Sequence, residues 1–294
     1  MRILSGVRIS EEKGNMKKQN QALREAFSQK QVLIASHRGV SGGNILENTI
    51  PAFRNALLQG ADIVELDVCP STDGVLYVYH DGYEPFHFGT STNLRRMTSA
   101  QIDALRFTNR YCVKVAQGVE RLEDALRSLK GKCFVNLDRC YRDFDAPLQM
   151  VRDFGMTDQV IFKTFVEEDL LARVARDYSD VMFMPLLGRA SEIETLEKFD
   201  LNVVACELVF KDPNQDIALP ETVRLLRERY GELWANPICC EDDLILCGGF
   251  DDNRSILESF DAGWGELLRR GFRILQTDWP LLLLQYLKQC GFRK

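Results

Sequence analysis

The sequence of 294 residues predicts an α/β protein built as one (β/α)8 TIM barrel, with a small insertion after a hairpin on the second strand. Two observations lead to this fold class. Short apolar runs alternate with helical patterns along the chain, which is typical of a parallel sheet, and eight runs remain once one is assigned to the hairpin. Eight parallel strands are the number that closes into such a barrel.

The barrel strands are expected where four to six mainly apolar residues occur together and turn-forming or polar residues follow. Helical periodicity occupies most of the intervals between them. The predicted strands are residues 32–36, 62–67, 133–138, 160–163, 181–185, 202–206, 233–236 and 272–276, and the predicted helices are residues 48–59, 143–153, 167–177, 191–198, 221–228 and 256–269.

The first predicted helix has clear start and stop signals. Thr49 suits the position before a helix, because its hydroxyl can accept a backbone N–H, and Pro51 suits the first turn, where no donor is needed. Gly60 suits the position after the helix, where the backbone commonly turns left-handed. Residues 37–39 therefore follow the C-terminal end of the first strand, where barrels of this kind carry their chemistry.

A ninth apolar run, residues 75–79, follows the second strand after only a few residues. A parallel neighbour needs a crossover of about ten residues or more, so this run is expected to pair antiparallel with the second strand. Asp73-Gly74 is a favourable tight-turn pair for such a hairpin. The hairpin returns His80 to the barrel end at which the second strand finishes.

Composition narrows the classes of protein. The net charge is −6, from 37 Lys and Arg against 43 Asp and Glu, so no basic field favours a nucleic-acid partner. The longest apolar runs, such as residues 281–284, are far shorter than the ~20 residues of a membrane span. Nine cysteines without a CxxC pair, two of them adjacent at Cys239-Cys240, fit small buried residues in a reducing cytoplasm better than disulfides or zinc.

Residues 1–30 are expected to be a leader or capping segment, with a weakly amphipathic helix at residues 20–29. Charged residues at 11–13 interrupt the apolar stretch that an export signal needs, and Met16 offers a second start. Residues 31–294 then form the barrel. Within them, residues 82–118 form an insertion rich in aromatic and polar side chains, which we expect to cover the barrel mouth.

Three acidic side chains are expected at that mouth. Glu65 and Asp67 are two residues apart on a strand, so they point to one side, and Asp138 ends the third strand. Carboxylates buried together repel each other and lose hydration, so they need a cation, a shared proton or a basic partner. One divalent cation, Mg²⁺ or Ca²⁺, fits this set of oxygen ligands. The alternative is an ion pair of the acids with Arg38 or Arg139.

Two of the three histidines directly follow a predicted strand or hairpin arm. They are His37 and His80, whereas His87 falls in the insertion and is expected to be a loop residue. Imidazole can withdraw or donate a proton near neutral pH. Arg38 offers a planar fork for a phosphoryl oxygen and Lys163 a second positive charge, or both balance the acidic mouth. Together these groups indicate cleavage of a phosphodiester.

The same residues belong to an ordered series of motifs. They are His37-Arg38-Gly39, Leu46-Glu47-Asn48-Thr49, Ala52-Phe53, Gly60-Ala61-Asp62, Glu65-Leu66-Asp67, Thr72-Asp73-Gly74 and His80-Asp81. The series resembles the glycerophosphodiester phosphodiesterase family, densely over residues 37–81 and more faintly at residues 122–126, 136–138 and 277–280. This resemblance implies a barrel with two catalytic histidines and one divalent metal. It also implies hydrolysis of glycerophosphodiesters to glycerol 3-phosphate and an alcohol.

Carried over by motif, the resemblance implies a role for each matching residue. His37 and His80 would form the acid/base pair, Glu65 and Asp67 would bind the metal, and Arg38 would bind phosphate.

The chain departs from the family pattern in places that bear on the site. Asp138 stands where the family usually has Glu as third metal ligand, and Cys140 stands where it commonly has Lys, a charge that Lys163 could restore. Near the seventh strand, family members often carry a Trp-Thr stretch, whereas this chain has Leu-Trp-Ala-Asn at residues 233–236. Trp234 and Asn236 are therefore candidate pocket residues, with a core position as the alternative for Trp234.

The resemblance implies that a substrate hydroxyl beside the phosphoester attacks phosphorus and forms a cyclic phosphate, which water then opens. Two alternatives stay open from the sequence. One is a non-catalytic or weakly catalytic protein that binds a phosphorylated metabolite, motivated by Asp138 and Cys140, and the other is a lyase that stops at the cyclic phosphate. The substrate is expected to be a small soluble phosphodiester, since no basic amphipathic helix indicates a membrane surface.

Overall fold

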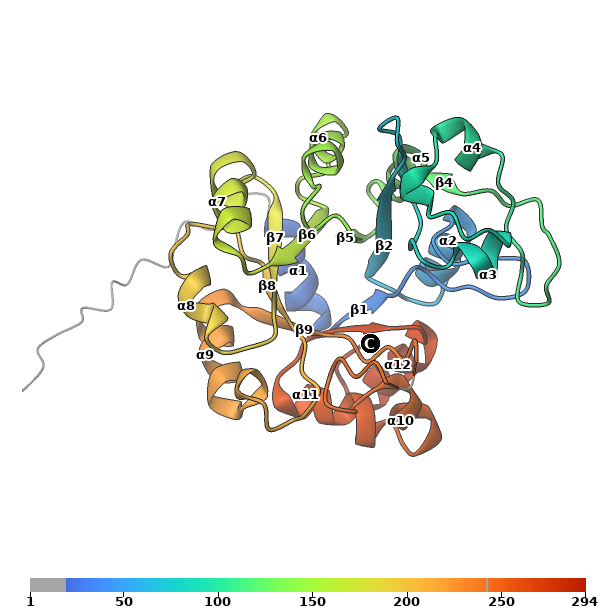
Figure 1. Cartoon of the computed structure of the whole chain (residues 1–294). Coiled ribbons are helices and arrows are strands. Elements are labelled where there is room, and N and C mark those ends of the chain that lie inside the picture. Colours follow the sequence, from blue (N-terminus) through green and yellow to red (C-terminus); the bar gives the residue numbers. More distant parts are fainter. Residues whose placement is uncertain (1–19, 242) are drawn as a thin grey trace, which may run out of the picture.

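The computed structural model describes residues 20–241 and 243–294, and eight parallel strands within them close into a barrel. Closure follows from the first strand, which pairs with both the second and the last. All eight predicted strands are confirmed, with ends shifted by a few residues. They are β1 (Leu33–Ser36), β2 (Ile63–Pro70), β5 (Phe134–Asp138), β6 (Val160–Phe165), β7 (Met182–Leu187), β8 (Ala205–Leu208), β9 (Glu232–Ala235) and β10 (Ile274–Thr277) (Figure 1).

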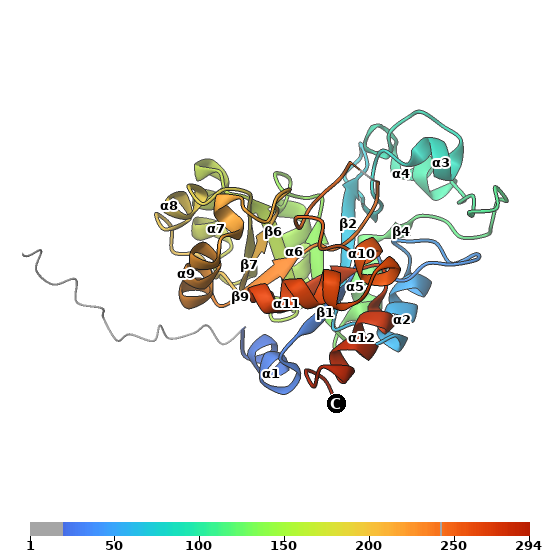
Figure 2. The ribbon, with the colours of Figure 1, turned by 90° about the horizontal axis from the view of Figure 1, so that it is seen from below.

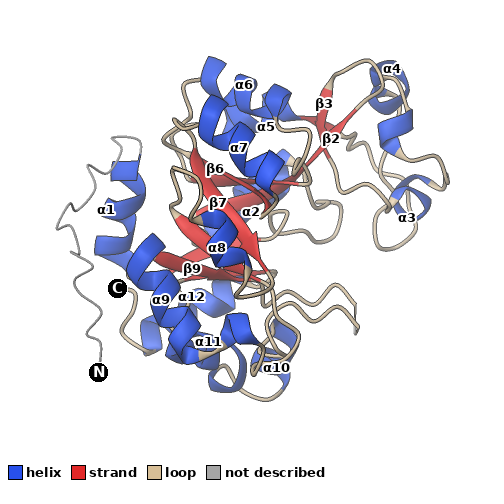
Figure 3. Ribbon diagram, turned by 60° about the vertical axis from the view of Figure 1, so that its left-hand side comes forward, coloured by secondary structure: helices blue, strands red, loops and turns tan. Residues whose placement is uncertain are grey.

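Helices surround the strands on the outside of the barrel (Figure 3). Val64 and Leu66 of β2 belong to the same buried cluster as Phe53 and Ala56 of the helix that follows β1. Alternate residues of β2 therefore point away from this cluster and into the barrel. The helices around the barrel are α2 (Ile50–Leu58), α5 (Leu122–Leu129), α6 (Asp145–Asp153), α7 (Glu168–Asp177), α8 (Glu192–Leu196), α9 (Pro220–Tyr230), α11 (Glu266–Arg270) and α12 (Pro280–Gln289).

A short helix, α1 (Gln21–Lys30), lies against one end of the barrel (Figure 2). Leu23 on this helix is buried among strand residues that include Ile63, Trp234 and Ile274. Apolar burial of this kind closes the N-terminal end of the barrel. Residues 1–19 of the expected leader, with the export signal and the second start considered there, lie outside the described residues.

The hairpin after β2 forms as predicted. β3 (Leu76–Val78) pairs antiparallel with β2, with Val68 opposite Val78, and β4 (Glu120–Arg121) extends the ribbon. The insertion contains α3 (Glu84–Phe88), a 3₁₀ turn and α4 (Ser99–Asp103), and it lies beside β2 in Figure 1. It has a core of its own, because residues of the hairpin and the insertion form a separate buried cluster. That it covers the mouth stays a prediction.

The prediction of one continuous helix over residues 256–269 is wrong. Trp264 is fully buried, its indole donates to Asp252 Oδ1 at 2.8 Å, and its backbone N–H donates to Ser255 Oγ at 3.0 Å. These contacts fold the segment back on itself, and no Cβ fits at Gly263 beside Ser255. The segment consists of α10 (Asp252–Leu257), a π-helical turn (Asp261–Gly265) and α11.

The cysteines only partly match the expectation of small buried residues. All nine are free thiols. Four are buried, namely Cys69, Cys140, Cys206 and Cys247, and the others are half-buried or exposed. Among the described residues, no helix has the length and apolar character needed to cross a membrane.

Gly39, directly after His37 and Arg38, allows a test of how closely the chain packs against α2 at this point. Its φ is +77°, and a Cβ there would lie 2.7 Å from the carbonyl carbon of Ala52, whereas Gly43 has φ +59° and open space around it. We expect Gly39→Ala to lower the free energy of unfolding by about 2–5 kcal/mol, through left-handed strain plus overpacking. Gly43→Ala carries only the strain, about 1–2 kcal/mol. Urea unfolding measures both, and equal losses would contradict the close packing.

Candidate active site

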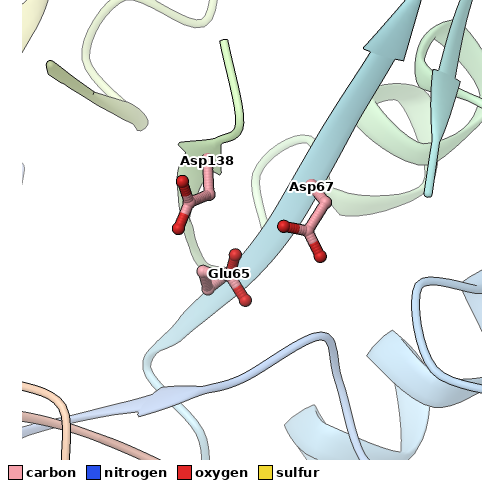
Figure 4. A group of neighbouring side chains, drawn as sticks. All are labelled: Glu65, Asp67 and Asp138. Carbon is pink, nitrogen blue, oxygen red and sulfur yellow. The ribbon is translucent and has the colours of Figure 1, made fainter. Parts of the chain in front are cut away.

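Three carboxylates meet where β2 runs beside the C-terminal end of β5. The parallel register places Asp67 beside Asp138, and Glu65 lies two residues before Asp67 on the same side of β2. One oxygen from each residue lies within 4.8 Å of the others (Figure 4). Glu65 and Asp67 are buried and Asp138 is half-buried. The structure thus brings together the three acids that the sequence proposed as metal ligands.

The three acids differ in how their charge is balanced. Burial and the neighbouring Asp67 raise the pKa of Glu65 to about 8, and its carboxylate accepts a hydrogen bond from the backbone N–H of Arg38 at 2.9 Å. Burial alone would raise the pKa of Asp138, but Lys163 at 2.8 Å brings it below its usual value. An all-oxygen cluster in which Glu65 has no cationic partner among the described side chains fits a hard divalent ion.

Arg38 forms part of the alternative ion-pair arrangement. Its Nε lies 3.0 Å from Asp67 Oδ2, and its Nη1 donates to Glu47 Oε1 at 2.9 Å. Asn48 also donates to Asp67 Oδ2, at 2.8 Å. Arg139 contacts Asp81 instead of the acid cluster. The ion pair predicted as an alternative is therefore present for Asp67 and Arg38, and it leaves Glu65 without a cationic partner among the described side chains.

His37 is held by residues from the last strand. Its backbone N–H donates to Thr277 O at 3.2 Å, and its Nδ1 lies 2.9 Å from Asp278 Oδ1. Burial favours the neutral ring, but the hydrogen bond and charge of Asp278 together raise the pKa of His37 above its usual value. Asp278 is itself held, since its backbone N–H donates to Asp252 at 3.0 Å.

His80 follows β3 and arrives at the same mouth. The hairpin hydrogen bond from Tyr79 N to Asp67 O, at 3.0 Å, places His80 next to the acidic end of β2. Burial lowers the pKa of His80, and its buried Nδ1 has no hydrogen-bond partner among the residues described. The ring of Tyr83 packs edge-on at 5.0 Å. The two imidazoles therefore have opposite pKa shifts at one site.

His87 lies in α3 and not in a loop, which corrects the sequence-based expectation. It is buried, and its Nδ1 lies 3.2 Å from the hydroxyl of Tyr79. Its ring also packs edge-on against Phe107 at 5.2 Å. His87 thus belongs to the packed core of the insertion.

Lys163 forms ion pairs with two carboxylates. Its ammonium lies 2.8 Å from Asp138 Oδ2 and 2.9 Å from Glu207 Oε2, and its side chain is 2% exposed. Contact of Lys163 with phosphate stays a prediction. Cys140 is a neutral thiol, because burial raises its pKa to about 12. That Lys163 restores the positive charge missing at Cys140 also stays a prediction.

Trp234 and Asn236 connect to Lys163 through a chain of hydrogen bonds. The indole of Trp234 donates to Asn236 Oδ1 at 2.7 Å, and Asn236 Nδ2 donates to Glu207 Oε1 at 2.7 Å. Trp234 is fully buried in the core at the closed end of the barrel. Of its two possible roles, the structure shows the core role, with the indole orienting Asn236.

Sequence reasoning assigned no role to Glu207, Asp278, Asn48 or Glu47. Glu207 was missed because the predicted strand ended at residue 206, whereas β8 runs two residues further. Asp278 directly follows β10, and a position directly after a barrel strand was the available signal. Asn48 and Glu47 stood inside a quoted motif, but only the fold shows that they face Asp67 and Arg38.

The buried position of Lys163 predicts a large loss on its removal. Lys163→Met leaves Asp138 and Glu207 buried without their cation, so we expect the free energy of unfolding to fall by about 3–5 kcal/mol. Lys198→Met is the matched control, since Lys198 pairs with Glu168 on the surface, and it should cost at most about 1 kcal/mol. Urea unfolding in EDTA measures both. Equal small losses would show that the buried carboxylates do not depend on Lys163.

The fold and this cluster define a class of protein: a (β/α)8 barrel whose strand ends gather carboxylates, imidazoles and a guanidinium at one mouth. Residues 37–229 match the sequence model described as the glycerophosphoryl diester phosphodiesterase family. Because this match covers more than half of the chain, the chain belongs to that family. Residues 183–287 also match a model described as a domain of unknown function.

Curated relatives match over shorter stretches. A glycerophosphodiester phosphodiesterase of Caldanaerobacter subterraneus is 53% identical over 49 residues, covering 17% of this chain and 20% of that protein. The uncharacterised protein YqiK of Bacillus subtilis is 31% identical over 160 residues, covering 49% of this chain and 61% of that protein. A mouse lysophospholipase D is 46% identical over 50 residues, covering 17% and 15%. The chain thus spans less than two thirds of each of these relatives.

Solved structures share the fold over most of the chain. A glycerophosphoryl diester phosphodiesterase from Parabacteroides distasonis has a TM-score of 0.71 at 18% identity, covering 88% of this chain and 87% of that one. A phosphodiesterase from Oleispira antarctica, in complex with the product sn-glycerol-3-phosphate, has a TM-score of 0.65 at 16% identity, covering 90% and 99%. At these identities the likeness supports the barrel fold.

Proposed function

We propose that the protein hydrolyses a small glycerophosphodiester to glycerol 3-phosphate and an alcohol, with the help of one divalent cation. The observation that carries this proposal is the meeting of His37, His80 and three carboxylates at one barrel mouth. Family membership supports the reaction class. The product named for the Oleispira antarctica enzyme supports glycerol 3-phosphate as the phosphate-containing product.

Glu65, Asp67 and Asp138 would hold the cation, and Mg²⁺ or Ca²⁺ suits their oxygen ligands. When bound, such an ion neutralises phosphoryl charge as a Lewis acid. The pKa of about 8 at Glu65 supports this choice, because burial and the charge of Asp67 both disfavour its ionised form and a bound cation would offset both.

Two imidazoles suit the proton transfers of this reaction. In the first step one ring takes the proton of the substrate hydroxyl beside the phosphoester, the hydroxyl oxygen bonds to phosphorus, and the other ring protonates the departing alcohol oxygen. A cyclic phosphate results, and water opens it with the two roles reversed. Asp278 steadies the charged form of His37, and Arg38 is the guanidinium nearest the acids for a phosphoryl oxygen.

The direct test incubates the purified protein with glycerophosphocholine or glycerophosphoinositol, with Mg²⁺, Ca²⁺ or Mn²⁺ and with EDTA. Glycerol 3-phosphate release should require a cation. His37→Gln and His80→Gln should each lower kcat by about 10²–10⁴-fold, because each removes a proton-transfer group. His87→Gln is the matched control and should retain activity, since His87 lies in the core of the insertion.

The same assay separates the alternatives. If the protein binds the phosphodiester tightly but does not turn it over with any cation, the proposed function changes from a hydrolase to a binding protein. A cyclic phosphate that persists in the phosphorus NMR spectrum would identify a lyase that lacks the second step.

Asp278→Asn should change the pH profile in one direction. The Asp278 carboxylate raises the pKa of His37, so its removal lowers that pKa and moves the limb of the profile set by His37 to lower pH. The other limb should stay in place, because the main causes of the pKa shift of His80 are its burial and the charges of other residues, Asp67 first among them. Profiles of kcat/KM measure both limbs, and the one that moves assigns the role of His37. If neither limb moves, Asp278 does not act on a catalytic imidazole.

A further inference from the structure

We propose that a second site, on the outside of the barrel between α9 and α11, binds a small molecule that carries two or more phosphate groups. Figure 3 shows these two helices next to each other. The cleft between them has a volume of about 760 Å³. It is lined by five arginines, namely Arg224, Arg227, Arg269, Arg270 and Arg273. We call it the arginine cleft.

The arginine cleft has more guanidinium groups than carboxylates to pair with them. Arg269 and Arg270 share one carboxylate, that of Glu266, at 3.1 and 2.9 Å. Arg227 is only loosely paired, with Glu232 at 3.8 Å. Arg224 is similarly loose, with a carboxylate at 3.9 Å. Three carboxylates therefore pair with four of the five guanidinium groups, and the excess positive charge favours an anion.

Arg273 is the cation least balanced by its surroundings. It is half-buried and donates to two backbone carbonyls, Leu268 O at 2.9 Å and Phe272 O at 2.8 Å. Within the described part of the chain, no carboxylate forms an ion pair with it. Burial and the nearby charge of Arg227 lower the pKa of Arg273, which supports the same conclusion. Two like charges held together at one cleft are stabilised by a bound anion.

The chemistry of the walls indicates the class of ligand. Guanidinium groups bind phosphate through two parallel hydrogen bonds, and a volume of this size suits a small molecule better than one phosphate ion. Apart from the arginines and two acids, Glu228 and Glu266, the described lining residues are small or aliphatic, such as Pro220, Val223 and Gly271, and none is aromatic. Without an aromatic ring for stacking, the cleft favours a polyphosphate or a phosphorylated sugar or polyol over a nucleotide.

The arginine cleft is separate from the candidate active site. α9 ends at Tyr230 just before β9 begins, and α11 ends at Arg270 shortly before β10 begins. The cleft therefore lies toward the N-terminal ends of these strands, whereas the candidate active site lies at the opposite end of the barrel, where Asp278 follows β10 and Asp138 ends β5. This site does not depend on the proposed hydrolysis.

Calorimetric titration of the full chain with inorganic pyrophosphate tests the proposal. EDTA and low salt keep metal binding and screening small. Pyrophosphate should bind, and Arg227→Gln/Arg273→Gln should weaken binding by about tenfold for each guanidinium removed, as expected for charge-assisted hydrogen bonds. Inorganic phosphate should bind more weakly than pyrophosphate, because it engages fewer of the arginines.

Matched variants distinguish binding at the arginine cleft from binding at the candidate active site and from a non-specific effect of positive charge. Arg176→Gln/Arg189→Gln removes the same charge from exposed arginines that pair with adjacent acids, and it should leave binding unchanged. Arg38→Gln at the mouth should also leave it unchanged. If the double variant does not fold by circular dichroism, Arg227→Gln alone should show the tenfold loss. Absence of pyrophosphate binding, or binding lost in Arg38→Gln and kept in the double variant, would overturn the proposal.

Discussion

The mutual repulsion of three clustered carboxylates, two of them buried and one half-buried, is the constraint on which the candidate site depends. Each acid is balanced differently: Asp138 by the ammonium of Lys163, Asp67 by a guanidinium and an amide, and Glu65 only by a backbone N–H. Burying such charges is unfavourable unless partners are also buried and aligned. Polar side chains inside the barrel are therefore arranged around these acids, and Glu65 is where a bound cation would be stabilised most.

The two imidazoles at the barrel mouth have pKa values shifted in opposite directions, because their surroundings differ. His37 faces Asp278, and Asp278 is anchored through its backbone by Asp252, a buried acid that also accepts from Trp264. His80 has an unpartnered Nδ1 among the residues described. The irregular segment around α10 thus has a physical reason, because a straight helix could not bring Trp264 onto Asp252. The irregular segment therefore helps to hold Asp278 in place beside His37, through the contacts of Asp252.

Predictions from the sequence succeeded where the physical cause is local. The caps of α2 and the tight turn at Asp73-Gly74 depend on neighbouring residues, and the strand period sets which side Glu65 and Asp67 share. They failed where a distant contact overrides local preference. Residues 256–269 have helical periodicity, yet burial of Trp264 divides them, and the helical assignment of His87 depends on packing within the insertion.

The sequence by itself determined the barrel, the hairpin that returns His80 and the side of β2 that carries the acids, because all three follow from short-range spacing. Only the tertiary structure decided which cation meets which acid. Lys163 lies between Asp138 and Glu207 because β6 runs between their strands around the ring, and His37 meets Asp278, 241 residues away, because the barrel closes. Spacing along a chain cannot show such pairings, since they depend on how closed strands align side chains across the interior.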